Sequence, residues 1–167
     1  MTTATILSGS GIAIGDGAFD HCTHMTTVTM TSVTTLGRYS FYSCNSLTSV
    51  TIPGGVSAIK DYTFYACTSL TSVTIQNGVT SIGNGAFDHC TGLASLTIPS
   101  TVNSIGSYAF YSCSGLTSIS FNELAAPSVG TGWITGTASG ILGHAYVASN
   151  FPAPGIVWNG LTMGALN

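Results

Sequence analysis

The stretch that decides the fold is VTSIGNGAFDHCTGLASLTI, residues 79–98, because its pattern of apolar residues recurs along most of the chain. Each copy contains one thiol, and these thiols are Cys22, Cys44, Cys67, Cys90 and Cys113. A phenylalanine stands three residues before each thiol, at Phe19, Phe41, Phe64, Phe87 and Phe110. Successive copies are therefore 22, 23, 23 and 23 residues apart. A fixed period of this size predicts a solenoid, in which each coil buries its apolar edge by stacking on its neighbours.

Each unit divides into three segments. A Val-x-x-Ile segment predicts a brief extended stretch, and Gly-x-x-Ala-Phe-x-x-Cys predicts one short helical turn, because Phe and Cys three residues apart share a helix face. The third segment, Leu-x-x-Val-x-Ile, ends with a period of two. It predicts a strand with Val50 and Ile52 inward and Ser49 and Thr51 outward. Equivalent strands of successive coils then lie parallel and form a sheet.

The 167 residues divide into three regions on this pattern. Residues 1–13 form an N-terminal cap or partial coil, residues 14–121 form five complete coils, and residues 122–167 form a C-terminal capping region. In the last region the repeat pattern stops and large apolar side chains suited to covering the final coil appear, at Trp133, Phe151 and Trp158.

One coil is a residue shorter than the others. The missing residue falls between Met30 and Val33, where the later coils have three residues in place of two. Length variation of this kind is expected in a turn, where an insertion or deletion does least harm to the packed segments.

The pattern Leu-x-x-Val-x-Ile-Pro-x-x-Val-x-x-Ile-Gly-x-x-Ala-Phe-x-x-Cys resembles the leucine-rich repeat of the BspA-like, or Treponema pallidum, type. SLTSVTIPGGVSAIKDYTFYACTSLTSVTI, residues 46–75, matches it nearly throughout, and the resemblance covers about residues 12–121. It departs at Met25 and Met30, which replace aliphatic residues, and at Ser40 and Thr63, which replace the small Ala before Phe. The resemblance implies a β-rich leucine-rich repeat solenoid of about 23 residues per coil, with a parallel sheet, short helical turns and a C-terminal cap.

Composition excludes several function classes. Charged residues make up 4% of the chain, against about 25% in an ordinary globular domain. Arg38 and Lys60 are the only basic residues, so the chain has no array of cations for a nucleic-acid backbone. No apolar run is long enough to span a membrane. The first residues show no signal-peptide pattern, so an extracellular or cell-surface location is implied by the resemblance alone.

Candidate catalytic and metal-binding residues are few. The dipeptides Asp20-His21 and Asp88-His89 recur, but three coils separate them, about 14 Å at ordinary parallel-strand spacing, so they cannot share a metal. The thiols lack the paired Cys-x-x-Cys spacing of zinc and redox sites. We therefore predict no catalytic residue, no metal and no cofactor, and we expect the thiols to form a buried, reduced ladder.

Hydroxyl groups define the first candidate contact surface. The outward positions of the long strands carry Ser or Thr in every coil, and the candidate contact residues among them are Thr29, Thr51, Thr74 and Thr97. This pattern also fits an ordinary solvated face, because Thr favours strands. Flat Thr-x-Thr files further resemble those of ice-binding solenoids.

Tyrosines define the second candidate surface. They occupy two matched positions of the predicted turn in three units, at Tyr39, Tyr42, Tyr62, Tyr65, Tyr108 and Tyr111. A surface rich in Tyr and poor in charge is typical of a protein contact, since Tyr offers a large area at small entropic cost. Packing of the rings against neighbouring turns explains the same pattern.

Two functions are compatible with these surfaces. The resemblance implies a non-catalytic protein that mediates protein–protein interaction or adhesion at the cell surface or outside the cell. The alternative is a structural subunit that assembles with itself into an extracellular filament or array, because an open solenoid edge offers unpaired strand groups. The expected partner is accordingly another protein or a second copy of this chain.

Overall fold

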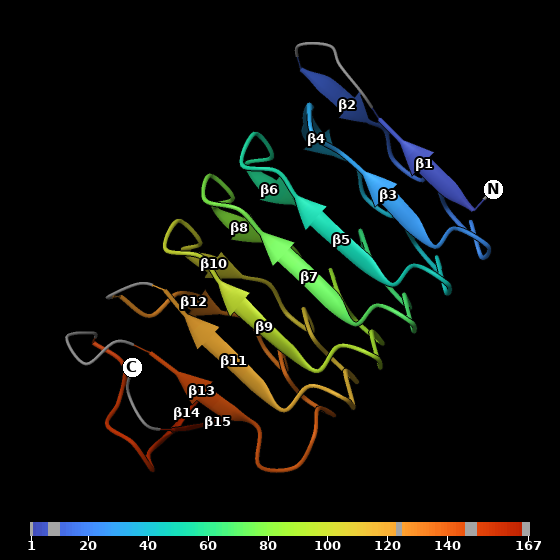
Figure 1. The fold of residues 1–167 in the computed structure, drawn as a ribbon. Helices are drawn as coiled ribbons and strands as arrows, with labels where there is room; N and C mark the ends of the chain where they lie inside the picture. The colour runs from blue at the N-terminus through green and yellow to red at the C-terminus, as the bar shows by residue number, and fades with distance from the viewer. Residues whose placement is uncertain (1, 7–10, 123–124, 146–149, 165–167) are drawn as a thin grey trace.

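The computed structural model describes residues 2–6, 11–122, 125–145 and 150–164. Successive coils stack along one axis, with β1 (Thr3–Thr5) near one end of the stack and β15 (Leu161–Met163) near the other (Figure 1). The long strands of the coils lie side by side and form one face, which we call the long face. They are β1 (Thr3–Thr5), β3 (Thr27–Thr29), β5 (Ser49–Ile52), β7 (Ser72–Ile75), β9 (Ser95–Ile98), β11 (Ser118–Phe121) and β13 (Leu142–His144). The predicted β-rich solenoid with parallel strands is confirmed.

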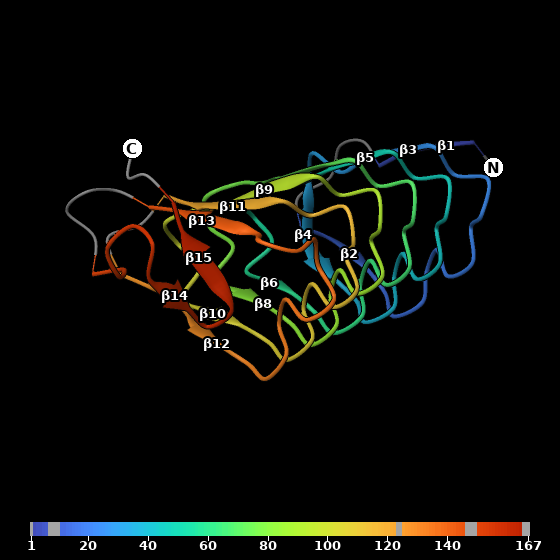
Figure 2. The ribbon, with the colours of Figure 1, turned by 90° about the horizontal axis from the view of Figure 1, so that it is seen from below.

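A second set of strands forms the short face, on another side of each coil (Figure 2). Its members are β2 (Ile12–Ile14), β4 (Val33–Leu36), β6 (Ala58–Ile59), β8 (Ser81–Ile82), β10 (Ser104–Ile105) and β12 (Ser128–Val129). Strands β6, β8, β10 and β12 pair in parallel, whereas β4 pairs with β2 in a separate sheet. Strands β8 and β10 each have a paired neighbour on both sides, whereas β6 and β12 are the outer strands of this sheet.

The third side of each coil is a series of turns, and the predicted helical turn is wrong: the described residues contain no helix. Tyr62 and Ala66 have φ of 56° and 54°, which interrupts a right-handed helix between them. The N–H groups of Tyr62, Phe64 and Ala66 instead donate to carbonyls of the next coil, at 2.9, 2.8 and 2.7 Å. The same bonds recur along the stack, so we call this side the turn column. The three-residue spacing of Phe and Cys is met by β-turns.

The core is a stack of identical side chains. The rings of Phe41 and Phe64 lie 5.3 Å apart and within 5° of parallel, and this geometry repeats down the column. Phe and Cys side chains of four coils are fully buried, at Phe41, Phe64, Phe87, Phe110, Cys44, Cys67, Cys90 and Cys113. Phe19 and Cys22 of the first turn are only partly buried, because the described chain places no turn beyond them.

Past residue 121 the parallel ladders continue for another coil, since β12 pairs with β10 and β13 pairs with β11. Trp133 takes the place of the phenylalanine, and its carbonyl accepts the Phe110 N–H at 2.7 Å. Strands β14 (Val157–Trp158) and β15 (Leu161–Met163) then close the end, with the Trp158 ring 5.9 Å from that of Trp133. In the part of the chain that the structure describes, no helix could cross a membrane.

Both ladders are interrupted at one place along the stack, between β3 and β5 on the long face and between β4 and β6 on the short face. We call this place the seam. Among the described residues, β3 and β5 pair at one position, Thr27 with Ser49, and β4 and β6 belong to different sheets. The seam lies at the coil that is one residue shorter, and the missing residue, between Met30 and Val33, falls just before β4. The turn column crosses the seam, where the Phe41 N–H donates to the Thr63 carbonyl at 2.9 Å.

Candidate functional site

The outward residues of the long face form the predicted hydroxyl surface. Strand β5 alternates exposed and buried residues as expected, and Thr29, Thr51, Thr74 and Thr97 are all exposed. Thr51 pairs with Thr74 across one ladder, but β7 and β9 belong to different sheets, so the hydroxyl file has breaks. A second break lies at the seam, between β3 and β5, where the surface forms a groove of about 320 Å³. Its lining residues are Val28, Thr29, Met30, Thr31, Thr51, Pro53 and Gln76.

The tyrosines lie on the turn column, and those of two adjoining coils stack on each other. The rings of Tyr39 and Tyr62 are 5.4 Å apart and within 4° of parallel. Those of Tyr42 and Tyr65 are 4.6 Å apart and within 7°. Tyr39 and Tyr108 are 43% and 46% exposed, while the other four candidate tyrosines are half-buried. The rings thus both pack on one another and reach solvent, which combines the two interpretations of the pattern.

Histidines extend the aromatic column through the two coils that lack the tyrosine pair. The His21 ring lies 5.5 Å from that of Tyr42. The His89 ring lies 5.6 Å from Tyr65 and 6.0 Å from Tyr111. We define the aromatic strip as two rows of rings. One row is His21, Tyr42, Tyr65, His89 and Tyr111, and the other is Tyr39, Tyr62 and Tyr108. Sequence reasoning considered these histidines only as metal ligands and missed their place on this surface, although Phe-Asp-His-Cys occurs in the two units where the tyrosines are absent.

Three tyrosines of this surface have a backbone conformation that L residues seldom adopt. Tyr39, Tyr62 and Tyr108 have φ of 57°, 56° and 59°. Glycine occupies the same position in other coils, and a Cβ at Gly85 would lie 2.4 Å from Cε1 of Tyr62. Glycine therefore makes room for the ring of the coil before it. A left-handed non-glycine residue costs about 1–3 kcal/mol, so the tyrosine side chains are present despite a local penalty.

The centre of the aromatic strip contains a buried acid. Asp88 is 8% exposed, and its Oδ1 lies 2.6 Å from Nδ1 of His89. Burial raises the pKa of Asp88, and the His89 contact opposes that shift. Burial and the Asp88 charge raise the pKa of Tyr65. Asp20 and His21 make the same 2.6 Å contact at the exposed first turn. The described residues contain no cluster of three or more ligand side chains able to hold a metal ion.

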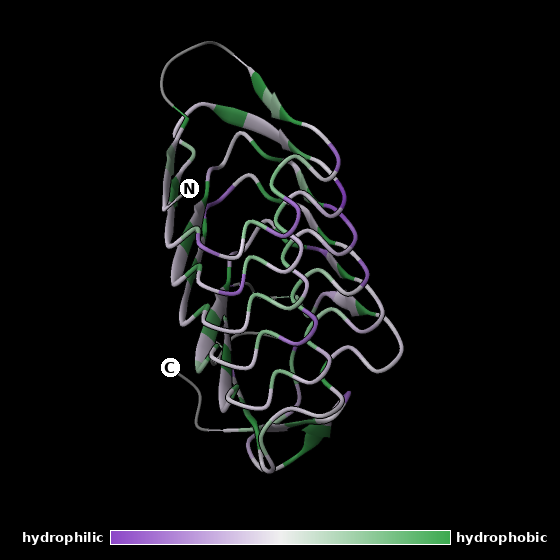
Figure 3. Cartoon of the chain, turned by 90° about the vertical axis from the view of Figure 1, so that its right-hand side faces the viewer, coloured by the Kyte–Doolittle hydropathy of each residue, from purple (hydrophilic) through white to green (hydrophobic). Residues whose placement is uncertain are grey.

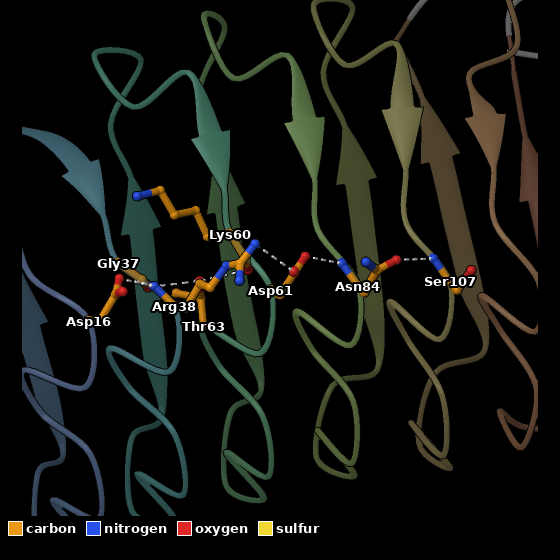
Figure 4. Close-up of polar contacts among 8 residues, drawn as sticks. All are labelled: Asp16, Gly37, Arg38, Lys60, Asp61, Thr63, Asn84 and Ser107. Carbon is orange, nitrogen blue, oxygen red and sulfur yellow. Dashed lines mark hydrogen bonds and ion pairs between the residues drawn. The ribbon is translucent and has the colours of Figure 1, made fainter.

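A polar ladder crosses the coils next to the aromatic strip (Figure 4). The Arg38 N–H donates to Oδ1 of Asp16 at 2.8 Å, and the Asn84 N–H donates to Oδ1 of Asp61 at 2.9 Å. Ser107 N–H donates in turn to Oδ1 of Asn84 at 2.9 Å. An ion pair of 3.4 Å between Nη2 of Arg38 and Oδ2 of Asp61 joins the ladder across the seam.

The charged residues of the chain gather at one groove of about 360 Å³ beside this ladder, which we call the charged groove. It is lined by both basic residues and two of the five acids, together with short-face residues: Asp16, Arg38, Ala58, Ile59, Lys60, Asp61, Ser81 and Gly83. On the side of the molecule shown in Figure 3, strongly hydrophilic positions are spread over several coils among pale and hydrophobic ones. Sequence reasoning noted that charge is scarce but not that it converges, because the four residues come from three different coils.

Comparisons with known proteins agree with this geometry. A leucine-rich repeat protein from Bacteroides ovatus shares 27% identity, with a TM-score of 0.74 over 88% of this chain and 38% of that one. A leucine rich cell surface protein from Faecalibacterium prausnitzii shares 25% identity, with a TM-score of 0.50 over 80% of this chain and 52% of that one. The T. pallidum leucine-rich repeat protein, at 24% identity, has a TM-score of 0.68 over 78% of this chain and 69% of its own, and shows the fold alone. The comparison with curated proteins gave no match.

The repeat itself identifies the family. The family described as the BspA type leucine rich repeat region matches residues 2–129 in six copies. That range holds the long strands from β1 to β11 and the stacked Phe and Cys side chains described above. The chain therefore belongs to the BspA-type leucine-rich repeat family.

Proposed function

We propose that this chain is a non-catalytic binding module that contacts a protein partner through the aromatic strip, at the cell surface or outside the cell. The observation that carries the proposal is the left-handed backbone of Tyr39, Tyr62 and Tyr108. A glycine at these positions avoids the local penalty, as it does at Gly17 and Gly85. A tyrosine kept at a position where glycine avoids the strain supports a role of the side chain in contact.

The composition of the strip supports the same function. Partly exposed tyrosines on a rigid, hydrogen-bonded scaffold present a large contact area with little entropy to lose on binding. Arg38 directly precedes Tyr39, and Arg and Tyr are enriched among residues that dominate binding energy. The extracellular location is supported by the family and by the cell surface protein from F. prausnitzii that shares its fold.

An array of purified extracellular and cell-surface proteins, probed with the labelled chain, tests this proposal. For any protein bound, the double variant Tyr42→Ser/Tyr65→Ser should weaken affinity by more than about tenfold. The matched control, Thr74→Val/Thr97→Val, changes exposed positions of the long face and should alter affinity by less than about twofold. Circular dichroism verifies the fold of each variant. Binding that survives the tyrosine variant but is lost with the threonine variant would assign the contact to the hydroxyl surface.

Self-assembly is a second candidate function, favoured by the state of the N-terminal coil. Strand β1 is at the end of its sheet, and Phe19 and Cys22 are partly exposed at the first turn of the turn column. Trp158 covers the opposite end of the core, so pairing through two N-terminal ends gives a closed dimer more readily than a filament. Sedimentation velocity tests this: a dimer that dissociates in the Thr5→Lys variant supports it, because Lys blocks edge pairing. A monomer at every concentration contradicts it.

A further inference from the structure

We propose that the charged groove binds a single side-chain carboxylate, from an Asp or Glu of the partner protein, between Lys60 and Arg38. This rests on the proposed function only in taking the partner to be a protein. The groove lies at the seam, and two of its lining residues, Arg38 and Asp61, directly precede Tyr39 and Tyr62 in the chain. A partner segment anchored in the groove therefore also reaches the stacked rings of these two tyrosines.

Lys60 occupies a position where the other coils have glycine. The equivalent residues are Gly15, Gly37, Gly83, Gly106 and Gly130. A Cβ at Gly83 would lie 2.7 Å from the Asp61 nitrogen, and one at Gly106 would lie 2.6 Å from the Asn84 nitrogen. Coils stacked at the ordinary spacing therefore exclude a side chain here. Lys60 is accommodated because β4 and β6 do not share a sheet across the seam.

The ammonium of Lys60 is available to a ligand. Within the described ranges, the ion pairs are Asp20 with His21, Asp61 with Arg38, and Asp88 with His89, so none includes Lys60. Figure 4 shows its side chain extending away from the ladder contacts. Arg38 makes one ion-pair contact, at 3.4 Å, with its side chain 60% exposed, which leaves most of its five donors free. Two cations with free donors therefore flank one groove.

The two acids of the groove limit the charge of the ligand. Asp16 and Asp61 line the same groove, and Asp61 is held in place by the Asn84 N–H and Arg38. A phosphate dianion would face the repulsion of both carboxylates, whereas a carboxylate brings one negative charge and matches the planar guanidinium. The groove is thus suited to a monoanion.

An NMR titration tests the proposal without any partner protein. The probes are N-acetylglutamate N-methylamide, its neutral glutamine counterpart and inorganic phosphate, each added at constant ionic strength to the 15N-labelled chain. The glutamate compound should give saturable shifts at the amides of Arg38, Lys60 and Gly83, and the glutamine compound should give none. Lys60→Gln should weaken the effect by about tenfold, and Lys60→Arg should keep it, because a cation is restored.

A charge-matched variant separates the site from overall charge. Lys60→Gln/Asn77→Lys has the net charge of the original chain but moves the cation to the turn after β7, where Asn77 is exposed; it should bind as weakly as Lys60→Gln. Tighter binding of phosphate at the same amides would overturn the carboxylate assignment. Absence of saturable shifts with every probe would overturn the site. Either failure leaves the tyrosine assay on the protein array unaffected, so the two proposals fail separately.

Discussion

The thiol of Cys67 donates to the backbone carbonyl of Phe41 in the preceding coil, with Sγ and O 3.2 Å apart. The same link joins Cys44 to Phe19, at 3.1 Å, and every later pair along the stack. Each thiol thus ties one turn to the turn before it. The Phe41 carbonyl also accepts the Cys44 N–H of its own turn, at 3.3 Å, so the Cys67 thiol adds a second donor from the next coil.

Thiol labelling should separate Cys22 from the other cysteines. Burial raises the pKa of Cys44 to about 12 and raises those of Cys67 and Cys90 well above the usual value. At pH 8 these groups stay protonated and therefore unreactive, since the thiolate is the nucleophile. Cys22 is partly exposed and should react first with Ellman's reagent. Labelling of all five thiols in the native protein at the rate seen in urea would contradict the buried ladder.

Phe64→Ala should reduce the free energy of unfolding by about 3–5 kcal/mol, because a fully buried ring is removed from the stack. Urea unfolding followed by circular dichroism measures the loss. Phe19→Ala is the matched control, and it should have a smaller effect because Phe19 is only partly buried. Equal losses at the two positions would show that burial within the stack does not determine stability.

Ser40→Ala should increase stability. The Ser40 hydroxyl is buried and, among the described residues, has no hydrogen-bond partner, while Ala86 and Ala109 fill the same position in later coils. Removing an unsatisfied buried hydroxyl recovers about 1–3 kcal/mol. Thr63→Ala should do the reverse, since Thr63 Oγ1 donates to the carbonyl of Lys60 at 2.8 Å. The two variants can be compared by thermal unfolding, and a loss of stability in Ser40→Ala would indicate that the hydroxyl is satisfied in solution.

Asp88 should make stability depend on pH in the acidic range. Burial raises its pKa in the folded protein, so the folded state binds a proton more tightly than the unfolded state does. As pH falls through the raised value towards the ordinary 3.8, the original chain should gain stability relative to Asp88→Asn. Urea unfolding of both proteins at several pH values tests this. If the free energy of unfolding of the original chain minus that of Asp88→Asn stays constant or falls as the pH is lowered, the raised pKa is contradicted.

The seam should couple the missing residue to Lys60. Inserting Gly between Thr31 and Ser32 restores the length of the other coils and should allow β4 to pair with β6, but it should also bring the Lys60 Cβ against the preceding backbone. We expect the insertion to destabilise the original chain and to be better tolerated in Lys60→Gly. The interaction free energy from the four proteins measures this coupling. Simple additivity would show that Lys60 does not depend on the seam.

Much of the fold could be predicted from sequence because the repeat itself encodes it. One Phe and one Cys per coil fix the register, and the alternation of Val50 and Ile52 with Ser49 and Thr51 fixes the strand faces. The sequence predicts helical turns where the structure has the turn column. The hydrogen bonds of the turn column join different coils, so the sequence of a single unit does not reveal them. Convergence of Arg38 with Lys60 at one groove depends on the same stacking in space.

The interrupted ladders have a mechanical consequence. When force is applied along the axis of the stack, each junction between coils except the seam resists through strand pairing together with the turn-column bonds. Where the second coil meets the third, resistance comes chiefly from the turn column and from the Arg38–Asp61 contact. Tension on a tethered molecule would therefore separate the first two coils from the remainder before any other junction yields.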